Sequence, residues 1–78
     1  MGVYTPRPPD NGRYSIEAYR YHVLSWLQAD TVNEALETAM QQWEQGQCYP
    51  TAIYAPSGRV LVGIRGLQRF FEFRLRSA

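Results

Sequence analysis

The stretch that decides the fold is TVNEALETAMQQWEQG, residues 31–46. Apolar side chains recur in it at i, i+3, i+4, i+7, i+8 and i+11, which is the period of one face of an α-helix. These positions are Val32, Ala35, Leu36, Ala39, Met40 and Trp43. Thr31 followed by Glu34 matches the capping box that begins many helices, and Gly46 suits a left-handed C-terminal cap. The sequence therefore predicts an amphipathic helix over residues 32–45.

Two segments after this helix have the patterns that are typical of β-strands. Residues 51–55 are partly β-branched, and the Ala55-Pro56-Ser57-Gly58 sequence that follows suits a tight turn. In residues 59–65, valine or isoleucine occupies every second position, which indicates a half-buried strand. We therefore expect a hairpin directly after the helix.

The last segment, residues 70–76, also alternates, with Phe71, Phe73 and Leu75 on one side. A helical stripe beginning at Leu67 is the alternative, but it leaves Phe73 outside the stripe. Phenylalanine also has only modest helix propensity. We therefore expect a strand here.

Residues 13–29, RYSIEAYRYHVLSWLQA, fit two structures. The early alternation around Ile16 and the density of tyrosine, valine and tryptophan favour extended structure. A helix that begins at Ser15 is the alternative, because apolar residues as far as Trp26 also recur at helical spacing. Seventeen residues are long for one strand. We expect a strand that is bulged or bent near Tyr21.

The first twelve residues, MGVYTPRPPDNG, contain three of the five prolines and end in a turn signal. We expect residues 1–12 to be an extended arm, with Pro6-Arg7-Pro8-Pro9 as a possible ligand of aromatic grooves. Residues 13–78 then form a single small domain. Its fold class is α+β with the order β-α-β-β-β, in which one amphipathic helix packs on a small, mainly antiparallel sheet.

The length of 78 residues limits how much of its own surface this domain can cover. A domain of this size buries only about 60% of the surface that its unfolded chain exposes. One helix covers one face of a four-stranded sheet, so the other face must meet water or a partner. The size of the domain therefore predicts an interaction surface.

Composition excludes several classes of protein. The hydrophobic fraction of 45% is too high for a disordered chain, and no apolar run approaches the length of a membrane span. A single cysteine, Cys48, excludes an internal disulfide framework and favours a reducing, cytoplasmic setting. No charged N-terminal stretch leads into an apolar segment, so we expect no signal peptide.

The net charge of +1 conceals a strong segregation of charge along the chain. All eight basic residues are arginine, and five of them lie in residues 59–76 beside one glutamate. Residues 30–45 carry four acidic residues and no base. The sequence thus predicts an acidic helix and an arginine-rich sheet.

Alternation in the downstream strands places arginine and aromatic side chains together on the face that points away from the helix. The residues expected on this face are Tyr54, Arg59, Leu61, Arg65, Phe70, Arg74 and Arg76. Arginine and aromatic residues are enriched in protein interfaces. The alternative is a solvated face on which the arginine stems cover the apolar side chains.

These features favour a small, non-enzymatic binding protein that contacts a partner protein or forms a homodimer through the arginine and aromatic face. The alternative is a protein that binds single-stranded RNA or DNA on the same face, stacking bases on the rings. The low net charge and the absence of lysine weigh against that alternative.

No pattern of residues indicates a catalytic or metal site. Cys48 and His22 could form a nucleophile and base, but neither has an orienting third group in the sequence. Glu34 and Glu37 are explained by the cap and solvated face of the helix rather than by metal binding. We expect no enzyme activity, no cofactor, no metal and no membrane partner.

Overall fold

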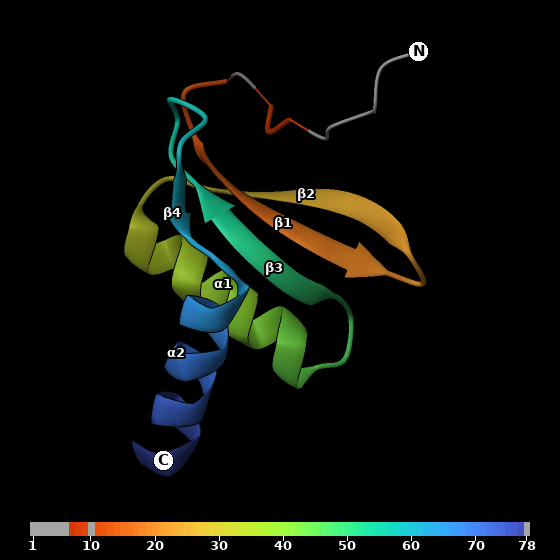
Figure 1. The fold of residues 1–78 in the computed structure, drawn as a ribbon, viewed down its shortest axis with the longest axis vertical. Helices are drawn as coiled ribbons and strands as arrows, with labels where there is room; N and C mark the ends of the chain where they lie inside the picture. Colours follow the sequence, from red (N-terminus) through yellow and green to blue (C-terminus); the bar gives the residue numbers. More distant parts are fainter. Residues whose placement is uncertain (1–6, 10, 78) are drawn as a thin grey trace.

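A computed structural model describes residues 7–9 and 11–77 of the chain (Figure 1). In chain order the elements are β1 (Tyr14–Arg20), β2 (Val23–Ala29), α1 (Val32–Glu44), β3 (Tyr49–Tyr54), β4 (Val60–Val62) and α2 (Ile64–Ser77). The strands form one antiparallel sheet in the order β2-β1-β3-β4. The predicted α+β class is confirmed, but the order of elements is ββαββα rather than β-α-β-β-β.

Helix α1 forms where the sequence predicts it. The backbone N–H of Glu34 donates to the Thr31 hydroxyl at 3.1 Å, so the predicted N-terminal cap is present. The helix ends at Glu44, and Gly46 adopts the predicted left-handed conformation with φ of 68°. Ala35, Ala39 and Met40 are its buried residues. The capping residues and the apolar stripe are therefore sufficient to define this element.

Residues 13–29 form a hairpin, so the prediction of one bent strand is wrong. The irregularity expected near Tyr21 is a two-residue turn, in which Tyr21 and His22 have φ of 51° and 66°. Two residues with positive φ are the requirement of a type I′ hairpin turn, for which glycine and asparagine are the common choices. The sequence signal is weak because a tyrosine and a histidine occupy these positions.

The last segment is helix α2, so the predicted strand over residues 70–76 is wrong. Leu67 and Phe71, which are one helical turn apart, are buried, whereas Phe73 is 68% exposed. The chain enters this helix directly after β4, which is shorter than the predicted strand over residues 59–65. Burial of two large side chains on one helical face outweighs the alternation that suggested a strand.

The hairpin that joins β3 and β4 is present as predicted. The N–H of Gly58 donates to the carbonyl of Ala55 at 2.9 Å, which closes a tight turn. After this hairpin, Gly66 in the first turn of α2 packs closely against Val62 of β4. A Cβ atom at Gly66 would lie 2.9 Å from Val62 Cγ1. Glycine therefore allows α2 to lie directly against β4.

Both helices pack on the same face of the sheet. Ile16 and Ile53 of the sheet share one core cluster with residues of both helices, which are Ala35, Ala39, Met40, Leu67 and Phe71. The rings of Trp43 and Phe71 stack at 4.8 Å between centroids and so join the two helices. In Figure 1 both helices lie on this side, and α2 extends away from the sheet toward the C-terminus.

The opposite face of the sheet, here called the open face, carries neither α1 nor α2. Register places Glu17 opposite Trp26 and Ser15 opposite both Gln28 and Tyr54, so these side chains share that face. The sequence predicted one uncovered sheet face, and the second helix adds cover only to the face that α1 already packs on.

Part of the predicted N-terminal arm lies outside the described residues, namely residues 1–6 and 10. Residues 7–9 and 11–13 form neither helix nor strand. Asn11 Nδ2 donates to Gln28 Oε1 at 2.8 Å, and Arg13 Nε donates to Asp30 Oδ1 at 3.0 Å. Among the described residues, no helix is both long and apolar enough to span a membrane.

Candidate interaction surfaces

The seven residues predicted to form one interaction face lie on three different parts of the molecule. Tyr54 is on the open face, whereas Arg59 and Leu61 lie in and beside the short edge strand β4. The remaining four, which are Arg65, Phe70, Arg74 and Arg76, belong to α2. The expected placement on one sheet face is wrong because the last segment is a helix.

Two of these α2 residues make contacts within the molecule. Phe70 packs against the core beside Phe71, with ring centroids 6.1 Å apart. The guanidinium of Arg74 lies 5.5 Å from the Phe70 ring centroid and forms a two-pronged ion pair with Glu37 of α1. Hydrogen bonding to Glu37 and its negative charge raise the pKa of Arg74.

The ion pair between Arg74 and Glu37 neutralises part of the charge that the sequence separates, because the acidic helix α1 and the basic helix α2 are neighbours. Arg65, Arg69 and Arg76 remain exposed on α2. They share one side of the helix with Glu72, since the four residues follow at i, i+4, i+7 and i+11.

The open face holds a cluster of half-buried side chains from three adjacent strands, here called the Glu17 cluster: Glu17 of β1, Trp26 of β2, and Thr51 and Tyr54 of β3. The Thr51 hydroxyl donates to Glu17 Oε1 at 2.5 Å, and the Tyr54 hydroxyl donates to Glu17 Oε2 at 3.3 Å. The Trp26 and Tyr54 rings meet edge to face at 5.4 Å. One carboxylate therefore lies beside two aromatic rings that are in contact with each other.

Local irregularity of the sheet helps to build this cluster. The register of β1 and β3 shifts between Glu17 and Ala18, where Ala52 pairs with Glu17 and Pro50 with Ala18. Thr51 is thus the extra residue of a β-bulge, a feature that re-aims side chains. Its hydroxyl also lies 3.2 Å from the Glu17 carbonyl oxygen.

Burial, followed by the charge of Glu17 and the hydrogen bond to it, raises the pKa of Tyr54 above its ordinary value of 10.0. The phenol therefore keeps its proton and continues to donate to Glu17 throughout the neutral range. A carboxylate has about four acceptor positions, of which the two hydroxyls use two. Two acceptor positions remain on this half-buried side chain.

Sequence reasoning identified Tyr54 in this cluster but missed its other three members. The alternation around Ile16 was a usable signal for Glu17, since it places Glu17 on the face away from the core. Trp26 could not be assigned, because its position opposite Glu17 depends on the turn at Tyr21 and His22.

Strand β2 forms one edge of the sheet, and its sequence VLSWLQA contains no charged residue, proline or glycine. Its pairing with β1 is regular over all seven residues. Strand β4, at the other edge, has only three residues. Long uncharged edges present free backbone groups that can pair with another strand, and most proteins protect them.

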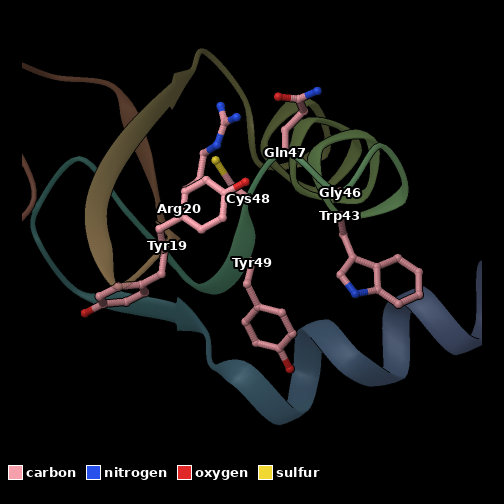
Figure 2. A pocket seen from close by; sticks show the side chains of 8 residues that line it. Tyr19, Arg20, Trp43, Gly46, Gln47, Cys48 and Tyr49 are labelled. Carbon is pink, nitrogen blue, oxygen red and sulfur yellow. The ribbon is translucent and has the colours of Figure 1, made fainter.

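A shallow hollow of about 330 Å³ lies where the β1–β2 turn approaches the loop between α1 and β3 (Figure 2). Figure 2 shows the rings of Tyr19, Trp43 and Tyr49 around it, and Cys48 also lines it. A neighbouring hollow of about 370 Å³ shares Trp43 and Tyr49.

The structure gives His22 and Cys48 different surroundings. His22 lies exposed in the β1–β2 turn and is not among the residues that line the hollow, whereas Cys48 is half-buried there. Within the described part of the chain, no three His, Cys, Asp or Glu side chains are grouped so that they could hold a metal ion. The absence of catalysis stays a prediction.

Comparison of the chain with protein-family models, with curated proteins and with solved structures finds no match.

Proposed function

We propose that this chain is a non-enzymatic protein-interaction module that binds through the open face of its sheet, with the Glu17 cluster at the centre. The observation that carries the proposal is a half-buried carboxylate that is hydrogen-bonded to Tyr54, beside the contacting Trp26 and Tyr54 rings, on the face that neither α1 nor α2 covers. The single cysteine is consistent with a cytoplasmic module.

The chemistry of the cluster favours a partner that presents a cationic side chain, above all arginine. A guanidinium can donate to the free acceptor positions of Glu17 while its plane lies against an aromatic ring. Cation–π contact with tryptophan is the strongest of its kind and adds to the charge-assisted hydrogen bonds. Aromatic residues at the centre of an interface also contribute much of the binding energy.

Single-stranded RNA or DNA has less support as the ligand of this face. Arg65, Arg74 and Arg76 of the predicted face lie on α2 rather than beside the Trp26 and Tyr54 rings. The charged group at the centre of the open face is the Glu17 carboxylate, which repels phosphate. Protein binding therefore fits the open face better.

The proposal is tested by selecting peptides from a random phage-displayed library against the wild-type protein. We expect selected peptides to contain arginine, and their affinity to fall about tenfold or more in Glu17→Gln, because a charge-assisted hydrogen bond is lost. Arg69→Gln, which changes the charge of an exposed α2 residue, is the matched control and leaves the affinity unchanged.

Two results would count against the proposal. Selected peptides without basic residues would contradict the recognition of a cationic side chain. Affinity that depends on Arg69 instead of Glu17 would move the site to α2. Binding of a labelled single-stranded oligonucleotide at low salt, weakened by Arg65→Gln, would favour the nucleic-acid alternative.

A further inference from the structure

We propose that β2 pairs with β2 of a second copy of the chain, antiparallel and centred on Trp26, so that two four-stranded sheets become one eight-stranded sheet. This inference goes beyond the proposed function, because it names a second copy of the chain as a partner and an edge of the sheet, rather than its open face, as the contact. Among the described residues, no strand pairs with the outer edge of β2, and its backbone groups are a different set of atoms from the Glu17 carboxylate.

The β1–β2 hairpin determines which backbone groups of β2 are free. In a two-residue turn, the N–H of Val23 donates back to the carbonyl of Arg20, so the backbone groups of Val23 point toward β1. Direction alternates along an antiparallel strand. The N–H and C=O groups of Leu24, Trp26 and Gln28 therefore point outward, away from the sheet.

These three outward residues define a register with two-fold symmetry. Trp26 is the middle residue of β2, with Leu24 two positions before it and Gln28 two positions after it. Antiparallel pairing about Trp26 sets Trp26 opposite its own copy and Leu24 opposite the partner's Gln28. This register uses every outward group and forms about six main-chain hydrogen bonds.

Side chains along the edge are compatible with this register. On the open face the two Trp26 rings become cross-strand neighbours, an arrangement that stabilises antiparallel pairs. On the helix face Val23, which is 63% exposed in the single chain, comes opposite the partner's Ala29. Apolar or small side chains therefore meet on that face.

Electrostatic repulsion does not oppose the pairing. Strand β2 has no charged residue, so no like charges meet at the two-fold axis. The two Glu17 carboxylates lie three strand spacings apart, or about 14 Å. That separation exceeds the screening length of about 8 Å at physiological ionic strength.

The inference is tested by solution mass, measured from low to high micromolar concentration. We expect the wild type to dimerise, and Leu24→Lys to weaken the dimer at least tenfold. The matched control is Leu61→Lys, which makes the same change at the β4 edge and leaves the dimer constant unchanged. A monomeric wild type, or equal weakening by both variants, overturns the inference.

The register is tested by disulfide trapping in a Cys48→Ser background, which removes the native thiol. Trp26→Cys places two thiols opposite each other at the two-fold axis, and we expect it to cross-link under mild oxidation. Leu24→Cys places its two copies about 13 Å apart, since four residues separate them along the edge, and does not cross-link. Equal cross-linking of both overturns the register, and this test remains valid if Leu24→Lys fails to fold.

The failure of this inference is distinguishable from the failure of the proposed function. A monomer that still binds arginine-containing peptides through Glu17 contradicts the β2 pairing alone. A β2 dimer in which Glu17→Gln has no effect on peptide binding contradicts the proposed function alone.

Discussion

The two faces of the sheet are made by neighbouring residues of the same strands, yet they have different chemistry. Ile16 and Ile53 are fully buried under the helices, whereas the adjacent Glu17 and Tyr54 are half-buried on the open face and joined by a hydrogen bond. One face supplies the apolar burial that stabilises the fold. The other holds a half-buried cluster of polar and aromatic groups, and it is the face on which we propose that binding takes place.

The largest difference between the faces is expected in stability. Leu67→Ala removes a fully buried side chain beneath the sheet, and we expect the free energy of unfolding to fall by about 3 kcal/mol. Leu61→Ala at the exposed edge strand is the matched control, with an expected loss below about 0.5 kcal/mol. Urea denaturation measures both. Equal losses would mean that the helices do not cover the face that they occupy in this structure.

A smaller effect on stability is expected for Trp26→Ala on the open face. The edge-to-face contact with Tyr54 and part of the ring's burial are lost, which costs about 1–2 kcal/mol. Binding of the selected arginine-containing peptides, measured by calorimetry, is expected to fall more than tenfold. A variant that loses stability but keeps its affinity for the peptides would separate Trp26 from the binding face.

A third prediction concerns the hydrogen bond within the Glu17 cluster and its dependence on pH. Tyr54→Phe removes the donor to Glu17 and is expected to cost about 1 kcal/mol at neutral pH. Because the pKa of Tyr54 is raised above 10.0, the folded state holds the phenol proton more tightly than the unfolded state does.

The contribution from Tyr54 is therefore complete below pH 10 and is lost as the pH rises through the higher folded-state pKa. Urea denaturation of wild type and Tyr54→Phe across this alkaline range measures the difference. We expect the two stabilities to converge as the pH rises. A constant difference would show that Glu17 and Tyr54 do not interact as the geometry indicates.

The smallest effect is expected at the ion pair that joins the two helices on the covered side. Arg74→Gln removes the pairing with Glu37, but both side chains are exposed and water screens the interaction. We expect the midpoint of thermal unfolding to fall by less than in Tyr54→Phe, and the difference from wild type to shrink in high salt. A loss that persists in high salt would indicate that Arg74 acts mainly through its packing on Phe70.

The two helices show how far sequence reasoning reaches in this chain. Thr31 and Gly46 mark the ends of α1, and the stripe between them has only the helical period, so the element was predicted nearly to its ends. In α2 the run of phenylalanines satisfies both periods. The choice depended on tertiary packing, since Phe71 stacks on Trp43 from a different part of the chain. Arginine in the last helical turn, at Arg74 and Arg76, was the local signal for a helix.

The β1–β2 hairpin and the Glu17 cluster were harder to predict for a related reason. Tyr21 and His22 adopt left-handed backbone conformations that the sequence does not announce, although histidine is enriched there among non-glycine residues. Without that turn, the partner of Glu17 across the sheet cannot be identified. Tyr54 was placed on the open face correctly, because the alternation of β3 alone determines its direction.

The most direct test of the open face as a binding surface is to map the amide chemical shifts of isotope-labelled wild type during titration with a selected arginine-containing peptide. We expect the largest changes at Glu17, Trp26 and Tyr54, with Arg65 and Arg69 unaffected. Changes concentrated on α2, or around Trp43 and Tyr49 at the hollow, would contradict this expectation.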